Sequence, residues 1–511
     1  MNSASVARPD AGHDPTAASP GGLKKDALSF AANVVIAVAS TAPAYSLAAA
    51  LPALVAAAKF GVPAILIVAF IPMLFVAIAY YHLNRADPDC GTTFSWTTRA
   101  LGPYAGWMGG WAIIATDILV MPSLAQIAGQ YSFRLFGVLQ PPAIAVTGVG
   151  VAWIVIMTAI CYYGIELSAR TQKFLLLAEV VLLVAFAAVA LAKVYAGGVA
   201  GAHPVSLGWF NPLRFNSGGD FTQAFLLAVF IYWGWDTGAS VNEETINPAT
   251  APGRSAILST VLLVGLYVLV SVAATAFAEP ALGRASAGCN GDFLAPLITG
   301  VLGPWGKLLV FTVLTSAAAC TQTTILPTAR TIISMARAGA LPKKFADIHP
   351  RFLTPGVATL AMGAVSIVWY LALTAISSNV LADSATATAI GIAFYYGLTG
   401  FACVAFYRRD LRSSLRNAIF LGLVPAAGGL IMLGLFIAAC IVYSKPEQSC
   451  TSLAGIGGAL MFGVGVLALG LVLMLLARLA LPEFFKRKPR SHSRLVSAPD
   501  SPSRESAAGS R

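Results

Sequence analysis

The sequence predicts an all-α polytopic membrane protein with about twelve transmembrane helices. Of its 511 residues, 58% are hydrophobic and only 10% are charged, and the mean hydropathy is +0.78. A soluble domain carries about 25% charged residues, and a helix needs about 20 apolar residues to cross a bilayer. Two of the apolar segments are interrupted near their centres, which is typical of the binding site of a secondary transporter.

The expected spans follow one another closely along the chain. They comprise residues 27–58 (interrupted), 63–83, 103–136, 143–163, 172–195, 221–246 (interrupted), 254–279, 302–337, 356–376, 386–407, 418–443 and 453–480. Residues 1–25 and 483–511 are expected to be disordered cytoplasmic tails, because both are polar and rich in small residues or serine. Residues 26–445 form the expected transporter core with span eleven, and residues 446–482 the last outer loop and span twelve.

The distribution of basic residues predicts that both termini are cytoplasmic. With the N-terminus placed inside, only seven of the 32 Lys and Arg residues fall on the outer side, which leaves 25 on the inner side. Loops on the cytoplasmic side of a membrane protein carry such an excess. The net charge of +11 is therefore a topology signal, and no nucleic-acid partner is expected.

The sixth apolar segment is interrupted at residues 231–238, which read Ile-Tyr-Trp-Gly-Trp-Asp-Thr-Gly. Glycine weakens a helix, and a carboxylate at membrane depth costs roughly 2.5 kcal/mol or more. Gly234 and Asp236 together predict a broken helix with a functional carboxylate. The first segment is interrupted at residues 40–46, Ser-Thr-Ala-Pro-Ala-Tyr-Ser, where Pro43 suits the first position of a new half-helix.

Two further acids fall within apolar segments. Asp117 lies in the third expected span and Glu179 in the fifth. At membrane depth an acid needs a partner, a proton or an ion. Two hypotheses stay open for each: a role in the substrate or ion path, and a structural hydrogen bond to a neighbouring helix.

Acids at the inner ends of the spans favour structural roles. Glu166 and Arg170 are four residues apart and are expected to pair on one helix face. Glu243 and Glu244 follow the second break and are interpreted as an inner gate or a packing pair.

The seven cysteines show no metal-ligand spacing, and neither a metal nor another cofactor is expected. Cys289 and Cys450 fall in expected outer loops, where a disulfide can form. Two free thiols are the favoured interpretation, because the sequence says nothing about their separation.

Three motifs carry a resemblance. Residues 328–355 contain the core Arg-x-x-x-x-Met-Ala-Arg-x-Gly-x-Leu-Pro and end in His-Pro-Arg-Phe-x-Thr-Pro. Residues 91–96 are similar to a Gly-Gly-x-Tyr-x-Trp pattern between spans two and three. Phe230-x-x-x-Gly234-Trp235-Asp236 resembles an aromatic-x-x-x-Gly-hydrophobic-acid pattern in a sixth span. Over residues 25–445 the chain thus resembles the amino acid permeases of the amino acid–polyamine–organocation superfamily.

The resemblance implies the leucine-transporter-like fold. Spans one to five (about 26–195) and six to ten (about 221–407) would be inverted repeats, and spans eleven and twelve would be peripheral. It also implies secondary active transport of amino acids across the plasma membrane by alternating access, with proton symport. An enzyme is not expected, and the sequence has no Gly-x-x-x-x-Gly-Lys-Ser/Thr motif for ATP binding.

The resemblance also implies a substrate site at the two breaks. The expected substrate-binding residues are Ser40, Thr41, Ala44, Tyr45, Phe230, Trp233, Gly234 and Asp236. The substrate carboxylate would meet the positive end of the half-helix that starts near Pro43, and its ammonium would meet carbonyls freed at the breaks. Phe230 and Trp233 are candidate gates.

The coupling-ion candidates are Asp236, Glu179 and Asp117, with a proton favoured over sodium. The chain departs from the family at two of the relevant positions. Pro43 stands where many members have a Gly-Ser/Thr-Gly run, so one amide donor is missing. Glu179 aligns with a lysine that in some proton-coupled members stands in for a sodium ion, and a glutamate cannot supply that positive charge.

Two other hypotheses remain. Asp117, Glu179 and Asp236 would make the cavity acidic, which suits a polyamine or another cationic amine moved by exchange. A polytopic membrane enzyme is the remote alternative, and the five histidines do not cluster as an enzyme of that class would require. The bilayer is an expected partner, and the oligomeric state stays open.

Overall fold

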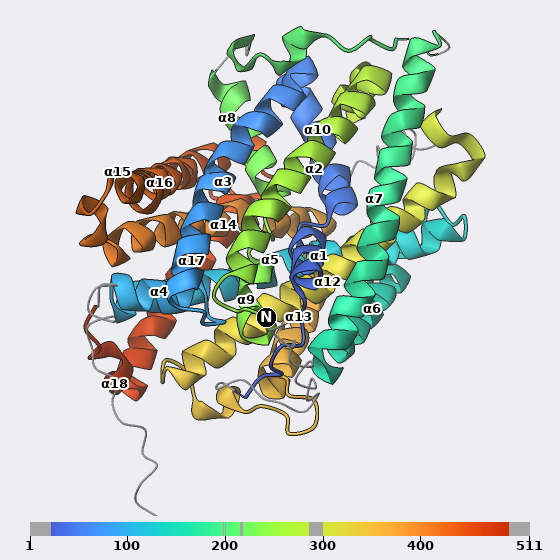
Figure 1. The fold of residues 1–511 in the computed structure, drawn as a ribbon. Coiled ribbons are helices and arrows are strands. Elements are labelled where there is room, and N and C mark those ends of the chain that lie inside the picture. Colours follow the sequence, from blue (N-terminus) through green and yellow to red (C-terminus); the bar gives the residue numbers. More distant parts are fainter. Residues whose placement is uncertain (1–21, 198, 200, 215–217, 286–299, 490–511) are drawn as a thin grey trace, which may run out of the picture.

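A computed structural model of the chain describes residues 22–197, 199, 201–214, 218–285 and 300–489 (Figure 1). These residues form a bundle of long helices. Among them the strands are limited to one antiparallel hairpin, β1 (Ser452–Leu453) and β2 (Ile456–Gly457). The expected all-α polytopic class is confirmed.

The first half of the bundle contains one broken and four continuous spans. They are α1 (Phe30–Ser40) with α2 (Pro43–Ala58), α3 (Val62–Ala86), α5 (Pro103–Leu135), α6 (Ala143–Tyr163) and α7 (Ile165–Tyr195). Proline opens α2 and α5, because its fixed backbone angle suits a helix start and its missing N–H is not needed there.

The second half repeats this order and adds two spans. Its helices are α8 (Gly218–Ile231) with α9 (Thr237–Ser240), α10 (Ala251–Ala285), α12 (Gly306–Arg337), α13 (Gly356–Ile376), α14 (Ser378–Phe406), α16 (Val424–Tyr443) and α17 (Gly458–Ala480). The short helices are α4 (Thr93–Ala100), α15 (Leu415–Asn417) and α18 (Pro482–Phe485), and a π-helical turn, Ala418–Leu423, leads into α16.

Within the described residues, ten regions are long and apolar enough to cross a membrane. One of them, Phe30–Ala86, holds both the broken α1–α2 span and α3, and the broken α8–α9 span is shorter and separate. The twelve expected spans are therefore all present. The largest boundary error is in the tenth, which begins at Ser378 rather than at residue 386. The fifth begins at Ile165 rather than at residue 172, because Gly164 (φ +146°) lets α7 start directly after α6.

Corresponding helices of the two halves pack together. α3 lies beside α10 and α5 beside α12, and the broken span α1–α2 meets α8–α9 (Figure 1). α16 and α17 pack on α14 at the edge of the bundle. This is the arrangement expected of two repeats with two peripheral helices.

The stretch between spans two and three, residues 84–102 in the expected arrangement, contains a helix. Residues 93–100 form α4, which is buried over almost its whole length. The Asp89 carboxylate accepts hydrogen bonds from Ser95 Oγ (2.6 Å) and from Ser334 Oγ of α12 (2.8 Å). Polar side chains in and beside α4 are thus satisfied inside the protein.

Just before α4, Asp87 forms an ion pair with Arg99. Burial nevertheless raises the pKa of Asp87 to about 6, against the opposing effect of Arg99.

The first described residues are also ordered, although the tail was expected to extend to residue 25. Leu28 pairs with Thr245 in a parallel bridge, and Leu23 and Leu28 are fully buried. Lys24 Nζ lies 2.9 Å from Glu166 Oε2. The expected pairing of Glu166 with Arg170 is therefore wrong, since the carboxylate turns to the N-terminal segment.

The structure describes both free and disulfide-bonded cysteines. Cys90, Cys161, Cys320, Cys403 and Cys440 are free thiols. Cys450 is disulfide-bonded, so the interpretation of a free thiol is wrong there. Cys289 lies outside the described residues.

Two ion pairs join α12 to the segment after α9. The guanidinium of Arg330 donates to both oxygens of Glu244, each at 2.9 Å, and neither side chain is exposed. Arg337 donates to Glu243 at 3.0 Å. Asp89, Cys90 and Glu243 place possible metal ligands within 4.8 Å of one another, but Arg337 already brings positive charge to this group.

We predict that Glu244→Gln strongly destabilises the folded protein. It leaves the Arg330 guanidinium buried without its counter-charge, a change that costs about 3–5 kcal/mol. Thermal unfolding of the purified protein measures the effect. Glu483→Gln is the matched control, because Glu483 pairs with Lys486 in a largely exposed pair that contributes little. Equal unfolding temperatures for the two variants would contradict the prediction.

Candidate functional site

The two helix breaks touch each other. α1 ends at Ser40, Ala42 adopts a left-handed conformation (φ +44°), and α2 starts at Pro43. Gly234, in the second break, has φ +120° and faces Ser40 so closely that a Cβ there would lie 2.5 Å from the Ser40 carbonyl oxygen. Glycine is needed at this position both for its backbone angle and for its size.

Hydrogen bonds join the breaks on either side of this contact. Ser40 Oγ lies 2.7 Å from Thr237 Oγ1 at the start of α9. Asn33 of α1 donates to the Gly238 carbonyl at 2.8 Å and to Thr245 Oγ1 at 2.9 Å. Backbone groups released inside a membrane protein must find such internal partners, so the breaks stabilise each other.

A small cavity lies at this junction. Its volume is about 10 Å³ when only the positions that the centre of a water molecule can occupy are counted. This is the room that one water molecule needs. The lining comes from both breaks and from α5, α12 and α14: Ser40, Ile113, Asp117, Trp233, Gly234, Asp236, Thr237, Thr323, Thr324, Pro327 and Tyr395.

Asp236 is held by two adjacent tyrosines of α14. Tyr396 donates to Oδ1 at 2.8 Å, and Tyr395 donates to Oδ2 at 3.2 Å. The indole of Trp233 in turn donates to the Tyr395 hydroxyl at 2.5 Å. The carboxylate is thereby fixed at one wall of the cavity, with a tyrosine hydroxyl on each of its oxygens.

Asp117 supplies a second carboxylate to the same cavity from α5. Its Oδ2 accepts a hydrogen bond from Thr328 Oγ1 of α12 at 2.5 Å. The lining contains no Lys, Arg or His side chain. Two acids without a basic partner make this cavity suited to a positively charged group.

Glu179 lies elsewhere, at the start of α2. Its Oε1 accepts hydrogen bonds from the Ala44 amide at 2.6 Å and from Ser316 Oγ at 2.7 Å. Ser316 Oγ also accepts from the Tyr45 amide at 3.1 Å. The second oxygen, Oε2, is buried without a hydrogen-bond partner in the described part of the chain. The amides expected to meet the substrate carboxylate are thus occupied by the protein itself.

The comparison with protein families identifies the family of this chain. A family model described as "Amino acid permease" matches residues 27–479. The chain belongs to the amino acid permease family. Like its relatives, this permease is a transporter and not an enzyme.

Its relatives include permeases for different solutes. An uncharacterized transporter of Mycobacterium tuberculosis is 29% identical over 86% of this permease and 89% of its own length. The branched-chain amino acid permease BcaP of Bacillus subtilis is 28% identical, over 59% of this permease and 65% of the relative. The low-affinity putrescine importer PlaP of Escherichia coli is 26% identical, over 60% and 66%.

The permease brings about half of the expected site residues together. Ser40, Trp233, Gly234, Asp236 and Asp117 line the cavity. The others lie outside the lining: Thr41 donates to the Val38 carbonyl, Ala44 and Tyr45 bond as described above, and Phe230 packs against the apolar core.

Sequence reasoning missed the partners of the acids. Tyr395 and Tyr396 stand side by side in an apolar span, where hydroxyls need acceptors, and this was the available signal. Thr328 was not considered as a partner of an acid, because hydroxyls in helices commonly bond back to their own helix. Thr328 does so at 3.1 Å, but it also holds Asp117.

We predict that Gly234→Ala abolishes transport and lowers the unfolding temperature. The added methyl group meets the Ser40 carbonyl and forces an unfavourable φ, a strain of order 1–3 kcal/mol. Gly265→Ala in α10 is the matched control, because nothing lies within 4 Å of its new Cβ. Thermal unfolding and solute uptake measure both variants, and normal uptake by Gly234→Ala would contradict the contact between the breaks.

Proposed function

We propose that this permease is a secondary active transporter that moves amino acids across the plasma membrane by alternating access, coupled to protons. The observation that supports this most directly is the small cavity where the two breaks meet. It is lined by Asp117 and Asp236 and by no basic side chain. A buried carboxylate requires a counter-charge or a proton, and a substrate ammonium group supplies the counter-charge.

The hydroxyl groups that line the cavity are suited to bind the carboxylate of an amino acid. Ser40, Thr237 and Thr324 line the same space as the two acids, and a hydroxyl can donate to a carboxylate. The ammonium would pair with Asp236 and Asp117, while the rings of Trp233 and Tyr395 pack beside it and favour a cation. The cavity must widen to admit such a substrate.

Glu179 is the proposed carrier of the coupled proton. As a carboxylate it accepts the Ala44 amide and Ser316 hydroxyl with one oxygen. Protonation weakens it as an acceptor, which releases the start of α2 and leaves the Ala44 amide free for a substrate carboxylate. A proton is preferred over sodium because one oxygen is already occupied by two donors.

Alternating access requires a seal on each side of the cavity. Arg330 and Arg337 lie further along α12 than the cavity-lining Thr324 and Pro327, so their ion pairs stand between the cavity and the basic end of the bundle. The excess of Lys and Arg at that end supports a cytoplasmic orientation of both termini. Opening toward the cytoplasm would break these pairs.

A polyamine or other cationic amine is the second candidate substrate. It is favoured by two observations: the cavity holds two acids, and the first amides of α2 are already capped. A diamine would pair one ammonium with each acid and needs no carboxylate site. An excess of putrescine, arginine or leucine, added during uptake of a labelled substrate, separates the two candidates by which of them competes.

We predict that Asp236→Asn lowers uptake by about thirtyfold or more, since losing one partner of a buried charge pair costs about 2–5 kcal/mol. The measurement is uptake into proteoliposomes under an imposed pH gradient, with a panel of amino acids and amines. Asp347→Asn, in an exposed loop, serves as the control with the same chemical change. The proposal is wrong if the wild-type protein takes up none of these solutes under the gradient.

We predict that Glu179→Gln uncouples transport from the pH gradient. The glutamine oxygen still accepts the Ala44 amide, so the fold is retained, but the side chain can no longer exchange a proton. Exchange of labelled for unlabelled substrate should continue at a measurable rate, whereas accumulation driven by the gradient should fall to the equilibrium level. Gradient-driven accumulation equal to wild type would exclude Glu179 as the proton carrier.

A further inference from the structure

A second hollow lies at the end of the bundle where α6 turns into α7. Its volume, measured in the same way as for the cavity above, is about 390 Å³, and the hollow opens at the surface of the protein. Three separate segments line it: the N-terminal segment at Lys24, the corner at residues 163–170, and the loop after α12 at residues 350–353. The proposed mechanism uses none of these residues.

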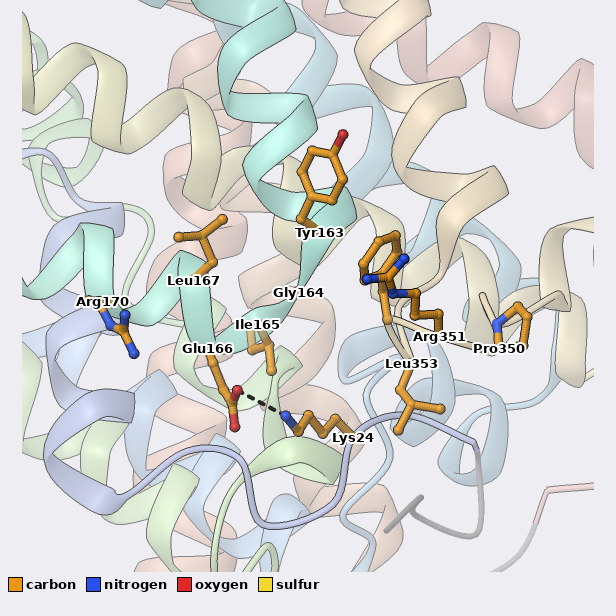
Figure 2. Close-up of a pocket in the computed structure, with 11 residues that line it drawn as sticks. Lys24, Tyr163, Gly164, Ile165, Glu166, Leu167, Arg170, Pro350, Arg351 and Leu353 are labelled. Atoms are coloured by element: carbon orange, nitrogen blue, oxygen red, sulfur yellow. Dashed lines mark ion pairs between the residues drawn. The ribbon is translucent and has the colours of Figure 1, made fainter. Parts of the chain in front are cut away.

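The hollow carries an excess of positive charge. Its charged lining residues are Lys24, Arg170, Arg351 and Glu166. Glu166 is bound to Lys24 at 2.9 Å (dashed in Figure 2), which neutralises both. Arg170 and Arg351 have no carboxylate partner among the described residues. Figure 2 shows them on opposite sides of the hollow, with the Lys24–Glu166 pair between them, and the Arg351 guanidinium lies over the Phe352 ring at 5.5 Å from its centroid. A guanidinium group therefore borders the hollow on each side, and such groups bind phosphate oxygens.

One wall of the hollow continues into an apolar stripe on α7. Leu167 lines the hollow, and Phe174, Leu177 and Val181 follow on the same helix face at intervals of three to seven residues. Leu167 is 42% exposed and Phe174 is 68% exposed. Arg170 lies on this face between them, so a guanidinium and an exposed apolar surface meet at one point.

Aromatic residues mark this end of α6 as the depth of lipid headgroups. Tyr163 is 57% exposed at the rim of the hollow, and its ring packs edge-on against Phe352 with centroids 5.3 Å apart. Tyrosines gather at the boundary between hydrocarbon and water in membrane proteins. The hollow is therefore placed to receive a headgroup, with an acyl chain lying along the stripe.

We propose that this hollow binds the phosphate of an anionic glycerophospholipid from the cytoplasmic leaflet. Arg170 and Arg351 hold the phosphate oxygens, and one acyl chain covers Leu167 and Phe174. A soluble phosphate would satisfy the guanidinium groups but would make no use of the apolar stripe that adjoins Arg170. The choice of leaflet rests on the proposed orientation, whereas binding itself does not depend on transport.

The test is lipid binding by the full-length protein in detergent, followed by native mass spectrometry. Dioleoyl phosphatidylglycerol is titrated against dioleoyl phosphatidylcholine. Wild type should retain one phosphatidylglycerol preferentially. The double variant Arg170→Gln/Arg351→Gln should bind it about thirtyfold more weakly, since each cation near a lipid surface contributes about a fivefold factor.

Arg408→Gln/Arg412→Gln is the matched control, because it removes two exposed arginines of another expected inner loop and should leave the retained lipid unchanged. Equal losses of bound phosphatidylglycerol in the two double variants would mean that diffuse surface charge causes the effect, and this would overturn the proposal. So would equal retention of the two lipids by wild type. Displacement of phosphatidylglycerol by millimolar inorganic phosphate would assign the hollow to a soluble anion instead.

Each variant is first checked by thermal unfolding. If the pocket double variant does not fold, Arg351→Gln alone is used, because Arg351 lies in an exposed loop. Its expected effect is about fivefold, and unchanged binding by this folded variant would contradict the role of the Arg170–Arg351 pair.

Discussion

Everything in the centre of this permease depends on how two interrupted helices satisfy their released backbone groups. In hydrocarbon, an unpaired N–H or C=O costs several kcal/mol, so a break is tolerated only where other groups replace the lost bonds. Here Gly234 lies against the Ser40 carbonyl, Ser40 bonds to Thr237, and Asn33 donates to Gly238. Each break therefore takes part of its stability from the other half, in addition to partners within its own half such as Glu179 for the Ala44 amide.

This mutual support explains why the cavity forms where it does. Helices α5, α12 and α14 cross the same level and contribute Asp117, Thr324 and Tyr395. The acids are not free charges in a pore, since hydroxyl groups from neighbouring helices hold each of them. Such pre-positioned hydrogen bonds fix where a positive group can bind, and they reduce the reorganisation that binding requires.

The spans and both breaks were predictable because local chemistry determines them. Each of these features can be recognised from a few neighbouring residues: runs of apolar residues, Pro43 at a helix start and Gly234 beside an acid. The partners were not predictable in the same way. Whether Glu179 faces a substrate or the amide of Ala44, and whether Glu166 bonds Arg170 or Lys24, depends on segments far apart in sequence. Likewise, polar residues of α4 find partners in distant helices, as Thr93 does in Tyr80 and Thr399 and Ser95 does in Ser334.

The bond between Glu179 and the start of α2 bears on how the unloaded transporter resets. A carrier whose binding groups have no partner in the empty site changes slowly between its two orientations. Such a carrier tends toward one-for-one exchange of solutes. Here a carboxylate of the chain itself accepts the first amide of the half-helix. We expect this self-occupied state to reorient without cargo, which favours net accumulation. Strong acceleration of uptake by internal substrate would argue against this view.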